Sequence, residues 1–398
     1  MKGDFLKYQA QTSPNPLALE ISNAKGNYVY DIKGKEYLDF IAGVSANTLG
    51  HNHPVISQAI KNQIDAYTHV MVYGEFIQKP QVELAKLLVQ NLPKPLETVY
   101  VTNSGTEATE GAIKLAKRFT GRYEIISAKN GYHGNTQGAM SVCGAEEQNS
   151  AFRPLIPGIK FITFNNEADL TKITSKTAAV ILETIQGGAG FIVPKNNYLQ
   201  KVKTQCKKVG ALLILDEIQS GIGRTGKLFG FENYNVIPDI IVTGKGLGGG
   251  MPIGAFIASY KMMSILKEHP KLGHITTFGG HPVITAAAVA TLSELLNSEL
   301  IKLTLQKEQL FRTLLIHPLI TEIRGKGLML AVIVESSEIA SKVILKSLEK
   351  GLLLFWLLFE SKAIRITPPL TISEKEIRKG CAIITNCLNE IFTENSSK

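Results

Sequence analysis

Long apolar runs are absent from this chain of 398 residues. The longest uninterrupted one, residues 352–359, falls far short of the roughly 18 residues that suggest a membrane span. Residues 1–8 contain no apolar segment of the kind that a secretory signal needs. We therefore expect a protein that has no membrane partner and stays in the cytoplasm.

Cysteine is scarce, and no two of the four cysteines form a C-x-x-C pair: Cys143, Cys206, Cys381 and Cys387. This pattern excludes a disulfide-stapled scaffold and favours free thiols in a reducing compartment. His51, His53 and His133 have no accompanying H-E-x-x-H or Cys/His set. A structural role is favoured for them, and we expect no bound metal.

Clusters of positive charge are also missing. Lysine and arginine number 43 against 34 acidic residues, a net charge of +9, but they are scattered without a run of five. That distribution favours a solvated surface over a nucleic-acid partner. The 44% of hydrophobic and 19% of charged residues are typical of a globular protein, and the length predicts two domains.

Short apolar runs alternate with helical stretches between residues 49 and 290. The first pair is a strand at 97–101 followed by a helix at 107–119. Further strands are expected at 178–182, 211–215, 239–243 and 253–258. The alternation predicts an α/β fold with an open, mostly parallel sheet.

The two ends of the chain show a different pattern. Residues 26–40 alternate apolar and polar side chains around a Lys-Gly turn, which predicts a β-hairpin. After residue 291, a helical segment, apolar runs at 327–334 and 364–367, and a helix between them predict a smaller α+β domain. We expect the hairpin to join it, so that segments 1–48 and 291–398 form a discontinuous small domain beside a large domain at 49–290.

Asp216 and Lys245 each follow one of the apolar runs of the large domain. Ligands of parallel sheets bind outside the carboxyl ends of the strands, so both side chains are expected at one ligand crevice. A lysine among glycines can form a Schiff base with a cofactor carbonyl, and a nearby acid can keep a pyridinium nitrogen protonated. This pair predicts pyridoxal 5′-phosphate (PLP) as the cofactor.

Three further groups have both a functional and a structural interpretation. Residues 102–107 follow a strand and precede a helix, so Ser104, Gly105 and Thr106 either bind a phosphate or cap the helix. Tyr132 lies in a turn-rich stretch and either stacks on a flat ring or packs in a loop. Arg365, inside an apolar run, needs the carboxylate of a structural partner or of a substrate.

Together these segments resemble class III (ω-type) aminotransferases, which are PLP-dependent enzymes of fold type I and include acetylornithine, ornithine and 4-aminobutyrate aminotransferases. The resemblance covers nearly the whole chain. It rests on residues 50–54, 104–108, 132–134, 183–187, 216–226, 245–252, 276–282 and 365–370.

The resemblance implies a role for each matching residue. Lys245 would hold the cofactor and then move the substrate proton, while Asp216 would pair with the pyridinium nitrogen. Arg365 would bind a substrate carboxylate. The rest of the implied cofactor site comprises Ser104, Gly105 and Thr106 at the phosphate, Tyr132 and His133 beside the ring, Glu183, Gln219 at the ring oxygen, and Thr277 from the neighbouring subunit of a homodimer.

Several positions depart from the family pattern, and they concern substrate choice. Gly188 replaces a glutamate that commonly neutralises the arginine at Arg365, and Asn135 replaces a common arginine. Val44 stands where ornithine enzymes tend to have tyrosine, and His281 replaces an asparagine. We predict that Gly188 leaves Arg365 open to a carboxylate, in a more apolar pocket that includes Phe355 and Trp356.

The resulting hypothesis is an aminotransferase that moves an amino group from an amine or amino acid to a 2-oxo acid, 2-oxoglutarate or pyruvate, by a ping-pong mechanism. One alternative is an aminomutase resembling the glutamate-1-semialdehyde enzyme, or a racemase, on the same scaffold. Another is a non-catalytic PLP-binding protein. A requirement for an added oxo acid distinguishes the aminotransferase from the aminomutase and the racemase.

Overall fold

The computed structural model describes residues 1–396, whose strands form three sheets. The largest sheet has seven strands in the order β4-β10-β9-β8-β7-β5-β6. Their bounds are β4 Thr98–Thr102, β5 Glu124–Ala128, β6 Ile159–Ile162, β7 Thr177–Glu183, β8 Leu212–Asp216, β9 Ile240–Gly244 and β10 Gly254–Ala258. Neighbours from β9 to β6 are parallel, whereas β10 is antiparallel to both β9 and β4. The predicted α/β fold with a mostly parallel sheet is confirmed.

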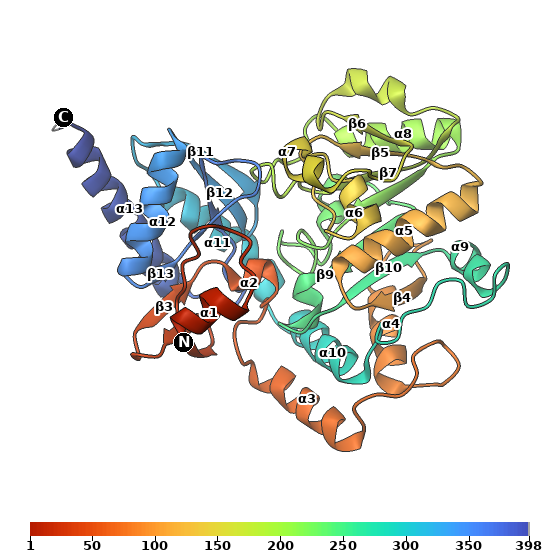
Figure 1. The fold of residues 1–398 in the computed structure, drawn as a ribbon, viewed down its shortest axis with the longest axis horizontal. Coiled ribbons are helices and arrows are strands. Elements are labelled where there is room, and N and C mark those ends of the chain that lie inside the picture. The colour runs from red at the N-terminus through yellow and green to blue at the C-terminus, as the bar shows by residue number, and fades with distance from the viewer. Residues whose placement is uncertain (397–398) are drawn as a thin grey trace.

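Helices cover both faces of this sheet (Figure 1). In β8, Leu212 and Ile214 belong to the same apolar cluster as helix α5 (Gly105–Thr120), while Leu213 and Leu215 belong to the cluster that includes α8 (Tyr198–Val209). Successive side chains of a strand point to opposite faces, so a strand covered on both sides must be apolar throughout. This burial explains the uninterrupted apolar runs that precede Asp216 and Lys245.

The two ends of the chain meet in a second sheet of order β1-β2-β3-β13. Its strands are β1 Ile21–Lys25, β2 Tyr28–Asp31, β3 Glu36–Asp39 and β13 Leu352–Leu353. Strands β2 and β3 form the hairpin expected at 26–40, and β3 pairs in parallel with β13. The N-terminal strands and the C-terminal elements accordingly lie together on one side of the molecule (Figure 1).

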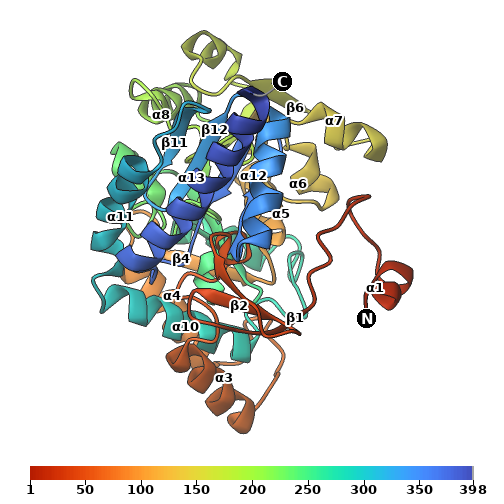
Figure 2. The same ribbon diagram turned by 90° about the vertical axis from the view of Figure 1, so that its left-hand side faces the viewer.

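A third sheet has the order β11-β12-β15-β14 and supplies one wall of the site described below. Its strands are β11 Ile320–Lys326, β12 Met329–Val334, β14 Phe355–Trp356 and β15 Ala363–Ile366. Helix α12 (Ser337–Glu349) packs on β12 and β15 and against the terminal helix α13 (Glu374–Ser396), which also contacts α11 (Leu300–Leu314). Figure 2 shows α12 and α13 side by side along this sheet.

Helix α10 (Pro282–Leu296) packs on α3 (Pro54–Ala66) and α4 (Lys79–Gln90). It runs through the domain boundary expected at residue 290, and that boundary stays a prediction.

No single helix among residues 1–396 is long and apolar enough to cross a membrane, although α10 and α11, bent by 71°, meet the length and composition as a pair. The remaining helices are α1 Lys2–Tyr8, α2 Ala42–Ser45, α6 Gln137–Ser141, α7 Glu146–Asn149 and α9 Tyr260–Ser264.

The four cysteines are all buried as free thiols. Within residues 1–396, no group of three or more His, Cys, Asp or Glu side chains is arranged to hold a metal ion.

Candidate active site

A cavity of about 600 Å³ opens at the carboxyl ends of β7, β8 and β9, facing β14 and β15. It collects most of the residues that the sequence singled out. Those in its lining are Val44, Gly105, Thr106, Tyr132, His133, Asn135, Glu183, Gly188, Asp216, Gln219, Lys245, Phe355, Trp356 and Arg365. Ser104 and Thr277 are not part of this lining.

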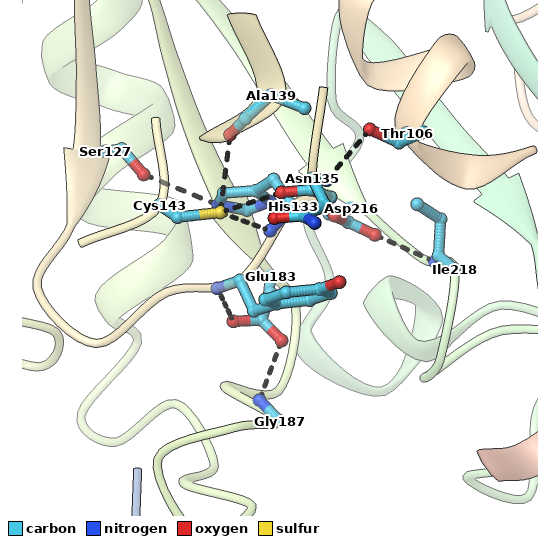
Figure 3. A network of polar contacts seen from close by, with 12 residues as sticks. Thr106, Ser127, His133, Asn135, Ala139, Cys143, Glu183, Gly187, Asp216 and Ile218 are labelled. Atoms are coloured by element: carbon cyan, nitrogen blue, oxygen red, sulfur yellow. Dashed lines mark hydrogen bonds and ion pairs between the residues drawn. The ribbon is translucent and has the colours of Figure 1, made fainter. Parts of the chain in front are cut away.

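Asp216, the last residue of β8, is held by two donors in the buried floor of the cavity (Figure 3). His133 Nδ1 lies 2.8 Å from Asp216 Oδ2, and the Ile218 amide donates to Oδ1 at 2.9 Å. Burial alone would lower the pKa of His133, but the hydrogen bond and charge of Asp216 raise it. The structure therefore fixes both carboxylate oxygens. His133 is placed behind the acid, a relationship that sequence reasoning did not foresee.

Lys245 follows β9 directly, and its partly buried side chain lines the cavity. Burial lowers the pKa of Lys245, and the positive charge of Arg365 lowers it further. A lysine with a lowered pKa has more of its amine in the neutral, nucleophilic form. The next residue has to be glycine, because a Cβ at Gly246 would lie 2.3 Å from Thr48 Oγ1.

The N-terminus of α5 faces the same cavity through Gly105 and Thr106. Ser104 has the capping role that was its structural alternative, because its side chain accepts a hydrogen bond from the Glu107 amide at 3.3 Å. Thr106 Oγ1 accepts from the Asn135 amide at 3.1 Å, which ties the 131–135 turn to the start of the helix. Free amides at a helix start are a general anion-binding feature. A phosphate contact from Ser104 itself stays a prediction.

Glu183, at the end of β7, orders the turn that contains Tyr132. Its carboxylate accepts from the Tyr132 amide at 3.0 Å and from the Gly187 amide at 2.8 Å (Figure 3). Burial raises the pKa of Glu183 to about 7. Gln219 lies nearby in the lining, with its amide nitrogen 3.3 Å from Ser45 Oγ.

Arg365, on β15, is buried, and no acidic side chain within the described residues pairs with it. Its Nε and Nη1 atoms have no hydrogen-bond partner within residues 1–396, and burial lowers its pKa to about 10. Opposite it, the position that a Cβ would take on Gly188 lies 2.8 Å from the ring of Phe359, whose amide donates to the Gly188 carbonyl at 2.9 Å. Sequence reasoning missed Phe359, because no local pattern marks a contact between segments so far apart in the chain.

Thr277 and His281 lie outside the cavity of their own chain. Thr277 is exposed, in an irregular segment next to Thr276, whose hydroxyl accepts from Asn103 Nδ2 at 2.9 Å. His281 caps α10 by accepting from the Val283 amide at 3.3 Å, and its ring stacks on His69 with 5.2 Å between centroids. The single chain thus gives His281 a structural contact and leaves Thr277 without a contact to the cavity.

Comparison with known proteins agrees with this geometry. The family model of class-III aminotransferases matches residues 8–388. The chain belongs to the class III aminotransferase family. The family membership therefore supports an aminotransferase. The aminomutase, the racemase and the non-catalytic alternative are not favoured.

Among relatives of this class III aminotransferase, the acetylornithine aminotransferase of Caldanaerobacter subterraneus is 39% identical, over 95% of this chain and 96% of the relative. The putrescine aminotransferase of Pectobacterium atrosepticum is also 39% identical, over 94% of this chain and 83% of the relative. A solved ornithine aminotransferase of Toxoplasma gondii, with PLP at partial occupancy in its active site, is 31% identical. It superposes with a TM-score of 0.92 over 100% of this chain and 96% of its own. The predicted fold, PLP-dependent transferase fold type I, is confirmed.

Proposed function

We propose that this class III aminotransferase binds PLP through Lys245 and transfers an amino group from an amine or amino acid to a 2-oxo acid in a ping-pong cycle. One observation supports this most directly: Lys245, Asp216 and the N-terminus of α5 converge on the same cavity. An amine, a fixed carboxylate and a helix N-terminus match the carbonyl, the ring nitrogen and the phosphate of the cofactor. When bound, PLP supplies an electron sink for the charge left on the substrate carbon.

The residues around the cofactor would hold and orient it. The amides at the start of α5, with the Thr106 hydroxyl, would bind the phosphate. Asp216 would accept a hydrogen bond from the protonated ring nitrogen, and its orientation is already set by His133 and by the Ile218 amide. Tyr132, held at its amide by Glu183, would cover one face of the ring, and Gln219 would contact the ring oxygen.

Lys245 would also move the proton. Once the substrate amine has displaced it from the cofactor, the amine of Lys245 would be free to take a proton from the substrate carbon and deliver it to C4′ of the cofactor. Its lowered pKa suits a base that works near neutral pH. Arg365 would bind a substrate carboxylate, since two of its buried nitrogens have no partner among the described residues.

We further propose a homodimer in which Thr277 contributes to the cavity of the partner subunit. The segment around Thr277 is unusually apolar for a free surface: Ile275 is 44% exposed and Phe278 52%. A partner that covered these side chains would remove apolar surface from water. Within each subunit, segments 1–48 and 291–398 would form the small domain and residues 49–290 the PLP-binding large domain.

A half-reaction experiment tests the enzymatic proposal. The protein is loaded with PLP and mixed with single amines, including ornithine, acetylornithine, putrescine and 4-aminobutyrate, while the visible absorbance of the cofactor is followed. We expect one donor class to bleach the band and an added 2-oxo acid to restore it. Product formation without any oxo acid would instead indicate an aminomutase or racemase. A PLP-loaded protein that responds to no donor would contradict the proposal.

A further inference from the structure

The cavity contains few positive charges. Of the lysines and arginines within residues 1–396, only Lys245 and Arg365 line it. Lys245 is committed to the cofactor under the function proposed above, and His133 is paired with Asp216. Arg365 is therefore the one cation of the lining available to a substrate.

In the part of the chain that the structure describes, no acidic side chain pairs with Arg365. Arg365 is 5% exposed, its Nε and Nη1 atoms have no partner within residues 1–396, and the centroid of the Phe191 ring lies 6.0 Å from the guanidinium carbon. Removing the partner from a buried charge is strongly unfavourable, so an unpartnered guanidinium in a cavity is a site for an external anion. A carboxylate fits it best, because two planar nitrogens can bind both of its oxygens.

Phe359 helps to keep an acidic side chain at position 188 away from Arg365. Its ring occupies the space into which a side chain at Gly188 would extend, with only 2.8 Å to the position of a Cβ. The backbone bond from the Phe359 amide to the Gly188 carbonyl fixes the two segments together. No acid can therefore reach Arg365 from position 188 without displacing the ring.

The wall next to Arg365 is apolar. It is formed by β14 and the residues after it, Phe355, Trp356, Leu357 and Leu358. The polar edge of Trp356 is already used, since its Nε1 donates to Ser341 Oγ at 3.1 Å. Across the cavity, Asn135 and Gln219 offer amides but no charge. Residues 275–278, which we propose to reach the partner's cavity, contain no basic side chain either.

We propose that the cavity selects substrates with a single carboxylate, bound by Arg365, and an uncharged, largely apolar remainder that packs against Phe355, Trp356 and Leu358. A second carboxylate on the substrate would lose its hydration against this wall and find no cation in return, which is costly. The amino acceptor is accordingly a monocarboxylic 2-oxo acid, pyruvate or a longer aliphatic homologue, in preference to 2-oxoglutarate. This inference rests on the aminotransferase function proposed above.

Two measurements on the PLP-loaded enzyme test the selectivity. In the first, the unreactive acids hexanoate and glutarate are titrated by calorimetry, which requires no turnover. In the second, the enzyme is loaded with pyridoxamine phosphate and mixed with pyruvate, 2-oxohexanoate or 2-oxoglutarate in single-turnover experiments. We expect hexanoate to bind, and 2-oxohexanoate to react, at least about 10-fold better than the dicarboxylates.

Variants separate this inference from the function on which it rests. Arg365→Gln should abolish the binding of hexanoate, and Arg365→Lys should restore part of it, because the lysine keeps the charge but not the paired geometry. Equal or tighter binding of glutarate, or unchanged hexanoate binding in Arg365→Gln, would overturn the inference. If hexanoate binds as expected but no oxo acid reacts with the aminated cofactor, the aminotransferase function fails while the carboxylate site stands.

Discussion

His133 and Asp216 form a buried pair, with Nδ1 of the imidazole 2.8 Å from Oδ2 of the carboxylate. The two residues come from different parts of the large sheet region: the turn after β5 and the end of β8. Because the Ile218 amide holds the other oxygen, the acid cannot rotate. A fixed carboxylate is what a ring nitrogen needs if it is to stay protonated throughout a catalytic cycle.

The pair predicts a pH-dependent contribution to stability. The pKa of His133 is raised in the folded chain. Protonation of His133 therefore contributes its full stabilisation below the ordinary histidine pKa of about 6.5. This contribution is lost as the pH rises through the pKa of His133 in the folded chain. His133→Asn should therefore lose more unfolding free energy at pH 6, about 1–3 kcal/mol, than at pH 9. Urea denaturation of the PLP-free protein at both pH values measures this. The control is His269→Asn, whose side chain is 93% exposed; equal losses at both pH values in His133→Asn would contradict the prediction.

Replacement of Lys245 tests the catalytic amine. Lys245→Ala should slow the half-reaction by at least about 100-fold, because the group that moves the proton is lost. After borohydride reduction of the PLP-loaded protein, mass spectrometry should find the cofactor covalently attached to the protein of native sequence and absent from the Lys245→Ala variant. Lys227→Ala, at an exposed lysine of a neighbouring loop, serves as the control. Attachment of the cofactor in Lys245→Ala would refute the assignment.

Mixed dimers test whether Thr277 acts across the subunit interface. One subunit has Lys245→Ala, and the other has Thr277→Glu, whose carboxylate would repel a phosphate. If Thr277 serves the partner, one site of the mixed dimer has both native residues, and each mixed dimer should have about half the activity of a native dimer. Each variant alone should be inactive. No recovery in the mixture would mean that Thr277 serves its own chain, whereas activity of the Thr277→Glu variant alone would mean that Thr277 has no role in the site.

The contact between Gly188 and Phe359 predicts how an internal acid would act. Gly188→Glu alone should cost about 1–3 kcal/mol of unfolding free energy, because the new side chain collides with the Phe359 ring. In the double variant Gly188→Glu/Phe359→Ala the collision is relieved, and the glutamate can pair with Arg365. Hexanoate binding should then fall at least about 10-fold relative to Phe359→Ala alone. Unchanged binding across these variants would show that position 188 does not control access to Arg365.

Features that depend on one strand and its end could be predicted from the sequence. Asp216 and Lys245 follow fully buried strands, and such strands leave an unbroken apolar run that ends where the ligand crevice begins. An apolar run does not indicate whether its strand is parallel or antiparallel to its neighbours, because a buried strand has the same composition in either orientation. The sequence therefore did not reveal that β10 is antiparallel to both of its neighbours.

Features that depend on pairing between distant segments could not be predicted. Strand β14 has two residues and β6 only four, too few for a periodic pattern to stand out. The partner of His133 is 83 positions away, and the ring of Phe359 reaches Gly188 only because the third sheet folds against the cavity. The role of Ser104 could not be predicted for a different reason: the same local residue pattern is typical of a helix cap and of a phosphate site.

The parallel pairing of β3 with β13 determines when the second sheet can be completed in the nascent chain. The hairpin emerges from the ribosome long before its last neighbour, Leu352–Leu353. Until then one edge of β3 is unpaired, and an open strand edge is a template for association with other chains. The hairpin therefore keeps an exposed strand edge throughout the synthesis of the segment that separates β3 from β13.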